Sequence, residues 1–134
     1  MGAARVRTTH QGLTLDAGAL IALDRGDRRV LALLQLAQAA RRPIRVPAAV
    51  LGQAWRDGSR QALLARFLRS RDVEIPPLDE ALGRAAGELC GSVGTSDVID
   101  ASVVLVARSH GDGVLTSDPG DLRKLDADLP LQRV

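Results

Sequence analysis

The chain has 134 residues, of which 46% are apolar, and this length and composition suit one compact domain with a single hydrophobic core. The net charge is only +2, and no apolar run approaches the roughly 20 residues of a membrane-spanning helix, so the sequence excludes such a segment. The basic residues near the N-terminus are not followed by an apolar stretch, so the start of the chain does not have the pattern of a secretory signal. One cysteine and two histidines exclude a disulfide scaffold and the usual zinc sites, and we expect a cytoplasmic protein that does not contact a membrane.

The predicted elements of the first half alternate between strands and helices. A short apolar strand at 13–16 precedes a helix through 19–23, and a second helix covers 31–37. A brief strand at 44–46 is followed by Pro47, which suits the first turn of a third helix. Trp55 lies in the apolar stripe of that helix and is expected in the core, and Gly58 ends the helix. A fourth helix at 63–68 and a strand at 73–75 follow.

The second half contains the clearest pattern. A helix over 82–89 is followed by a loop at 91–94, and then by three elements in succession: TSDVIDASVVLVARSHG as a helix with acids in its first turn, GVLTSD as a buried strand, and PGDLRKL as a short helix. The last residues, LPLQRV, can add one more strand. This alternation predicts a single α/β domain with a mostly parallel sheet and helices on both faces, and residues 1–12 are expected to form a flexible N-terminal extension.

Two of the predicted strands end in an aspartate, Asp16 and Asp118. Parallel strands place their carboxyl ends at one edge of a sheet, so we expect both carboxylates at that edge. Asp97 and Asp100 are three residues apart in the first turn of a helix and therefore share one helical face. If that turn opens at the same edge, three or four carboxylates converge.

Carboxylates packed closely repel one another and raise one another's pKa, so such a cluster is unfavourable unless a cation neutralises it. Ligation by oxygen alone, with no His or Cys in reach, favours Mg²⁺ or Mn²⁺ over zinc. Thr116 and Ser117, next to Asp118, are candidates to hydrogen-bond the carboxylates or a substrate phosphate.

Each acid also has a purely structural interpretation. Asp118, with Pro119 after it and Asp121 three residues on, has the pattern of a helix start, and Asp97 and Asp16 can cap helices in the same way. Capping does not explain why two separate strands both end in an acid.

The spacing of three segments resembles the PIN domain of VapC-type toxins from bacterial toxin–antitoxin pairs: LDAGALIAL, VPAAVLGQAWRDG and GTSDVIDASVVLVARSHGDGVLTSDPGDLRKL. The resemblance covers Leu13 to Leu125 and implies a three-layer PIN-like fold whose acids hold Mg²⁺ or Mn²⁺ and cleave single-stranded RNA. Carried over by motif, the catalytic and metal-binding acids are Asp16, Asp100 and Asp118, with Asp121 as a neighbouring acid. Asp97 is a further candidate ligand.

The chain departs from the family at Gln53, where the helix motif usually has Glu. The amide removes one negative charge but keeps an oxygen that can ligate. Two outcomes follow: Gln53 supports a weaker or single-metal site, which we favour, or the domain binds RNA and partners without cutting.

The sequence therefore predicts a metal-dependent endoribonuclease, the toxin of a type II toxin–antitoxin system. The resemblance also implies a homodimer and a cognate antitoxin whose C-terminal segment covers the acidic pocket. One alternative is a non-catalytic PIN-like binding module, motivated by Gln53. Another is a phosphotransferase or receiver-like domain, which fits poorly: a dehalogenase-type site needs an Asp where Gly18 stands, and the only lysine, Lys124, lies in a helix rather than directly after a late strand.

Overall fold

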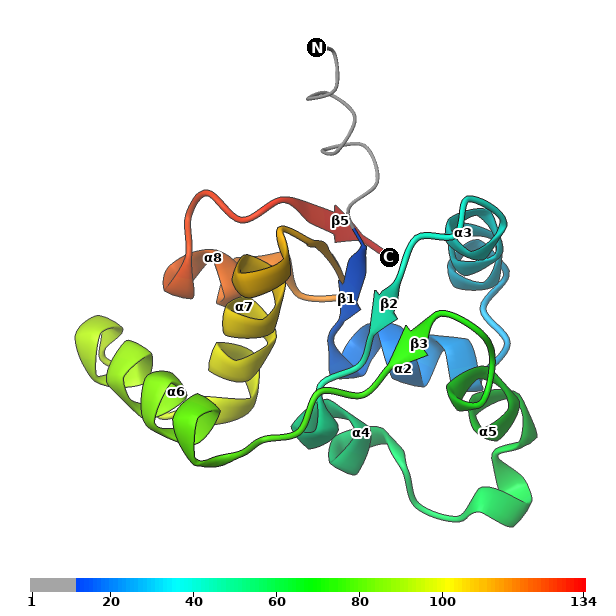
Figure 1. The fold of residues 1–134 in the computed structure, drawn as a ribbon, viewed down its shortest axis with the longest axis horizontal. Coiled ribbons are helices and arrows are strands. Elements are labelled where there is room, and N and C mark those ends of the chain that lie inside the picture. Colours follow the sequence, from blue (N-terminus) through cyan, green and yellow to red (C-terminus); the bar gives the residue numbers. More distant parts are fainter. Residues whose placement is uncertain (1–11) are drawn as a thin grey trace, which may run out of the picture.

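The computed structural model of the chain describes residues 12–134 (Figure 1). The extension predicted for residues 1–12 lies outside this range except for Gly12. Gly12 is buried, and a Cβ atom there would lie 2.9 Å from both Arg45 Nη1 and Asp112 Oδ1, so this position belongs to the packed domain.

Five strands form the central sheet in the order β3-β2-β1-β4-β5, and every neighbouring pair is parallel. Their bounds are β1 (Leu13–Leu15), β2 (Ile44–Arg45), β3 (Val73–Glu74), β4 (Gly113–Thr116) and β5 (Leu131–Arg133). The chain builds from β1 toward β3 on one side and then returns to place β4 and β5 on the other. The order therefore reverses between β1 and β4, and a crevice at the carboxyl ends of these two strands is the usual ligand site of such a sheet.

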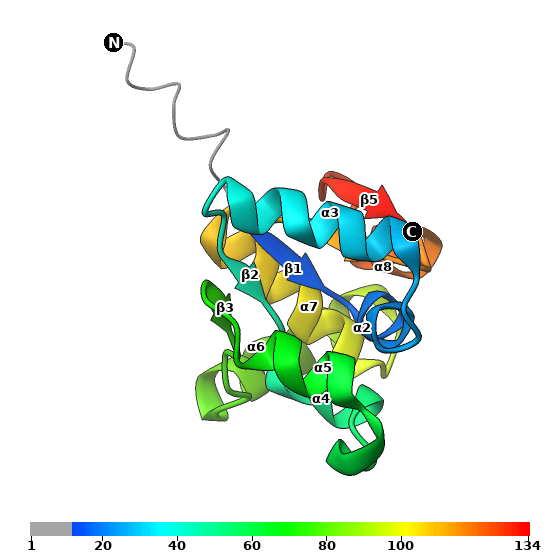
Figure 2. The ribbon, with the colours of Figure 1, turned by 90° about the vertical axis from the view of Figure 1, so that its right-hand side faces the viewer.

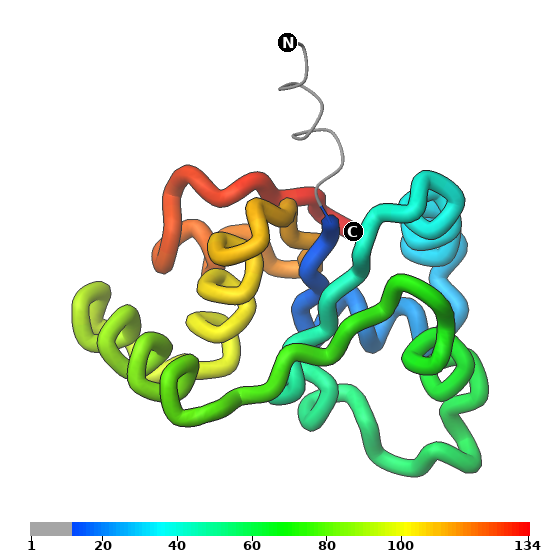
Figure 3. Tube along the Cα trace, viewed as in Figure 1, coloured from blue at the N-terminus to red at the C-terminus, as the bar shows by residue number. Residues whose placement is uncertain are grey.

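Helices cover both faces of the sheet, which confirms the predicted α/β class with three layers (Figures 1 and 2). The helices are α2 (Ala17–Asp24), α3 (Arg28–Ala39), α4 (Ala48–Ala54), α5 (Ala62–Leu68), α6 (Glu80–Val93), α7 (Val98–His110) and α8 (Pro119–Leu125), with a 3₁₀ turn η1 (Gly58–Arg60). In Figure 1, α6, α7 and α8 lie on one side of the sheet and α2, α3 and α5 on the other. The chain trace in Figure 3 shows α6 on the outer side of α7, away from the sheet.

The main core lies between the sheet and its flanking helices. Leu15 and Val114 of the sheet, Leu20 of α2 and Val103 and Val104 of α7 are fully buried in it. The α7 helix is buried along most of its length, which explains its nearly continuous apolar sequence. Its ends follow the dipole rule, with an acid in the first turn and Arg108 and His110 in the last, and left-handed Gly111 (φ 69°) closes it.

Two local predictions were wrong. The α4 helix ends at Ala54, and Trp55 adopts an extended conformation with 38% of its surface exposed, so it does not lie in the core. The loop predicted at 91–94 lies later, because α6 continues to Val93 and left-handed Gly94 (φ 77°) ends it.

Within residues 12–134, no single helix has both the length and the apolarity to cross a membrane. The α6 and α7 helices meet that test only as a pair, and they are bent by 110° relative to each other.

Candidate active site at the carboxyl edge of β1 and β4

Asp16 directly follows β1 and caps α2 at the edge where the strand order reverses. Its backbone N–H donates to the carbonyl of Leu115 in β4 at 3.1 Å, so the residue is still held by the sheet. Oδ1 accepts the backbone N–H of Ala19 at 2.9 Å. Oδ2 accepts the hydroxyl of Thr116, and only 7% of the residue is exposed. Burial raises the pKa of Asp16, while the bonds from Thr116 and from the Ala19 and Ser117 amides oppose the rise.

Thr116, the last residue of β4, connects two of the predicted site residues. It is completely buried, and its Oγ1 donates to Asp16 and accepts the backbone N–H of Asp118 at 2.8 Å. Sequence reasoning singled out Thr116 only as one of two hydroxyls near an acid. Its inward orientation depends on the pairing of β1 with β4, in which Leu15 lies opposite Leu115.

Asp97 and Asp100 lie at the start of α7. Asp97 caps the helix, with Oδ1 accepting the backbone N–H of Asp100 at 3.0 Å. The pKa of Asp100 is raised to about 7. Burial is the largest cause, and the Asp97 carboxyl, through its charge and a side-chain hydrogen bond, and the charges of Asp121 and Asp16 add to it. Acids from three separate stretches of the chain are therefore close enough to influence one protonation equilibrium.

A small hollow of about 120 Å³ lies between the start of α7 and α8, with Asp97, Asp100 and Asp121 in its lining. Lys124 also lines it and pairs with Asp121, with Nζ 3.6 Å from Oδ1. The hollow is thus acidic with one cation at its rim.

The capping interpretation holds for some of these acids and not for others. Asp16 and Asp97 each cap a helix, but the exposed carboxylate of Asp118 makes no capping bond although Asp118 directly precedes α8. Asp118 lies near enough to Asp16 that its charge adds to the rise in the Asp16 pKa. Capping therefore does not account for Asp118.

The comparison of the chain with protein families decides its membership. The family model described as the PIN domain matches residues 13–128. The chain belongs to the PIN domain family. No curated protein matches it significantly.

Solved structures have the same PIN fold. VapBC2 from Rickettsia felis, bound to a DNA fragment from its promoter, superposes with a TM-score of 0.67 at 17% identity, covering 91% of this chain and 98% of that one. FitAB bound to an IR36 DNA fragment superposes with a TM-score of 0.61 at 16% identity, covering 90% of this chain and 94% of that one. FitAcB from Neisseria gonorrhoeae superposes with a TM-score of 0.59 at 17% identity, covering 89% of this chain and 95% of that one. At these identities the likeness concerns the fold.

Gln53, the departure from the PIN motif, lies exposed in the last turn of α4. The α4 helix packs against α2 and α7, the two helices that Asp16 and Asp97 cap. Among residues 12–134, no hydrogen bond joins the Gln53 side chain to an acid of the site. Its place as a candidate ligand therefore remains a prediction.

The donor set of this PIN domain fits a hard divalent cation by its chemistry. All the acids near this edge offer carboxylate oxygen, the ligand type that Mg²⁺ and Mn²⁺ prefer. The mutual repulsion that helps raise the pKa of Asp100 is the cost that a bound cation would relieve. In the described part of the chain, no three acid, His or Cys side chains lie close enough together to surround one ion.

Proposed function

We propose that this PIN domain is a metal-dependent endoribonuclease that cuts single-stranded RNA and acts as the toxin of a toxin–antitoxin pair. The observation that carries the proposal is the gathering of acids near the carboxyl edge, where Asp97, Asp100 and Asp121 line one hollow. Burial, together with the charges of Asp97, Asp121 and Asp16, raises the pKa of Asp100 to about 7. PIN membership and the likeness in fold to VapBC2 and FitAB support the same function.

In the proposed reaction, Asp16, Asp100 and Asp118 would hold Mg²⁺ or Mn²⁺, with Asp121 beside them. A bound ion would lower the pKa of a water molecule so that it can attack phosphorus, and it would neutralise charge on the phosphoryl oxygens. Thr116 orients the Asp16 carboxylate, since its hydroxyl donates to Oδ2. The hydrogen bond from Ala19 fixes the other oxygen, so the carboxylate is held before substrate arrives.

RNA cleavage by the purified protein tests the proposal, with Mn²⁺, with Mg²⁺ and with a chelator. We expect cleavage that the chelator abolishes and that Asp100→Asn loses, while the control Asp128→Asn, an exposed acid in the turn before β5, stays active. Equal cleavage by Asp100→Asn, or cleavage in the presence of chelator, would contradict the proposed chemistry.

The second candidate function is a non-catalytic PIN-like module that binds RNA or protein. Gln53 favours it, because the amide supplies one negative charge fewer than the usual Glu. Calorimetry with Mn²⁺ separates the two functions: metal uptake without RNA cleavage supports the module, and cleavage excludes it.

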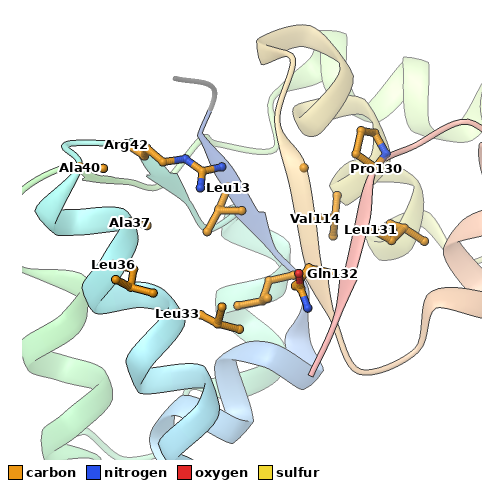
Figure 4. A pocket seen from close by; sticks show the side chains of 12 residues that line it. Leu13, Leu33, Leu36, Ala37, Ala40, Arg42, Val114, Pro130, Leu131 and Gln132 are labelled. Atoms are coloured by element: carbon orange, nitrogen blue, oxygen red, sulfur yellow. The ribbon is translucent and has the colours of Figure 1, made fainter. Parts of the chain in front are cut away.

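The proposed partners are a cognate antitoxin and a second copy of the chain. The homodimer is supported by an apolar hollow of about 380 Å³ between α3 and strands β1, β4 and β5, with no acid in its lining (Figure 4). Leu36 is part of this lining, yet 69% of it is exposed. A two-fold pairing that places each Leu36 against the other copy would bury it. Sedimentation of Leu36→Glu tests this, and a monomeric variant is the expected result.

A further inference from the structure

A hollow of about 450 Å³ begins beside Asp16 and extends along α2 to the start of α3. Gly18 and Ser117 line its inner end. A Cβ atom on Gly18 would overlap the Ser117 side chain and lie 3.5 Å from Oδ1 of Asp16. The turn after β4 thus approaches α2 as closely as a glycine permits, and the inner end of the hollow lies next to Asp16.

The outer end of the hollow is basic. Arg25 lines it, and Arg28 and Arg29 follow in the first turn of α3. All three are exposed, and within residues 12–134 none of them takes part in an ion pair. Asp27 is the one acid in the lining, and its Oδ1 accepts the backbone N–H of Val30 at 3.0 Å as the cap of α3.

This placement of arginines does not serve the helix. Cations in the first turn of a helix oppose its dipole, and α3 has Arg28 and Arg29 there with no acid among its first residues. The planar guanidinium group of arginine binds phosphate well, so an anionic ligand explains the position of these arginines, which helix stability does not explain.

The wall between the two ends is apolar, since it consists of Ile21 and Ala22 of α2. A cavity of this size lies in the range that holds a ligand of nucleotide size. An apolar wall with an arginine at one end, and with the neighbourhood of Asp16 at the other, matches a nucleotide, whose base is largely apolar on its faces and whose phosphate is anionic.

We propose that this hollow binds the nucleotide of single-stranded RNA next to the cleaved bond, with Arg25 on a backbone phosphate and Arg28 and Arg29 continuing the track. The inference rests on the proposed function for the identity of the ligand. It assigns Arg25 to substrate binding, with no part in the chemistry at the acids.

The test measures binding of a fluorescent single-stranded oligoribonucleotide by anisotropy, in chelator so that no cleavage occurs. Arg25→Gln is compared with Arg84→Gln, which removes the same charge from α6, on the opposite side of the sheet in Figure 1. We expect Arg25→Gln to raise Kd about 3- to 10-fold and to lower the slope of log Kd against log salt by about 0.7, and Arg84→Gln to change Kd less than about twofold. Ala22→Phe fills the hollow and is expected to weaken binding without changing the melting temperature.

Equal effects of Arg25→Gln and Arg84→Gln would overturn the inference even if the protein cleaves RNA. Binding that depends on Arg25 in a protein that cleaves no RNA would uphold it while refuting the proposed function. If wild-type protein does not bind the oligoribonucleotide, both fail.

Discussion

Thr116→Val tests the role of the buried hydroxyl between two acids of the site. Valine keeps the shape of threonine and its fit to a strand, but it can neither donate to Asp16 nor accept the N–H of Asp118. The substitution therefore removes two hydrogen bonds and leaves the packing of β4 nearly unchanged.

The size of the effect follows from the two bonds. A hydrogen bond to a charged group contributes about 1.5–3 kcal/mol and a neutral one about 0.5–1.5 kcal/mol. Thr116 is fully buried and Asp16 is 7% exposed, so water cannot readily replace the lost hydroxyl. We expect Thr116→Val to lower the free energy of unfolding by about 2–4 kcal/mol at pH 7 in metal-free protein.

The loss must also depend on pH. The Thr116 bond lowers the pKa of Asp16 against the larger effect of burial, so without the hydroxyl the pKa of Asp16 rises further. The bond favours the ionised carboxylate, and the destabilisation therefore grows as the pH rises through the folded-state pKa and shrinks toward pH 4.

Urea unfolding of wild type, Thr116→Val and Thr116→Ser, each at pH 4 and pH 7 with chelator, measures both effects. Serine keeps the hydroxyl and loses only a methyl group, so it is the matched control. A valine variant as stable as the serine variant, or a loss that is the same at both pH values, would refute the reasoning.

Three further predictions concern other polar groups. Because the folded-state pKa of Asp100, about 7, lies above its usual 3.8, metal-free protein loses stability as the pH rises through this interval, and thermal melts of Asp100→Asn should not show that loss. Asp112→Ala leaves Arg45 without its buried partner at 2.8 Å and should cost about 3–5 kcal/mol in urea unfolding; a cost below about 1 kcal/mol would contradict this. Gln61→Ala removes a buried amide that hydrogen-bonds Asp24 and the end of α4, and it should lower the free energy of unfolding by about 1–3 kcal/mol in urea unfolding. An unchanged free energy of unfolding would show that the turn after α4 does not depend on this amide.

The turn after α4 shows why one local prediction was wrong. The apolar stripe at 50–55 predicts a helix that continues through Trp55. In the fold, Oε1 of Gln61 accepts the backbone N–H groups of Arg56 and Asp57, at 2.8 and 2.9 Å. These bonds draw the backbone out of the helix after Ala54, and no periodicity in the sequence encodes them.

The α6 helix, in contrast, is longer than predicted. Gly91 predicts a break because glycine costs about 1 kcal/mol in a helix interior. Packing of Cys90 and Ala86 against Ala101 of α7 supports the helix past that point, and it ends only at Gly94. Tertiary contacts thus overrode the local propensity.

The sequence by itself determined the class of the fold and the candidate acids of the site. Alternating apolar runs specify strands and helices locally, and an acid at the end of a parallel strand lies at the carboxyl edge whatever the rest of the chain does. That is why Asp16 and Asp118 were placed at the edge correctly without coordinates.

Only the tertiary structure decided which groups share that edge and in what state. Strand order brings β4 beside β1, so Thr116 meets Asp16, and the packing of α7 and α8 places Asp100 near Asp121. Hydrogen bonding and electrostatic repulsion act over a few ångströms in space between residues up to 100 positions apart in the chain, and no local pattern contains that distance.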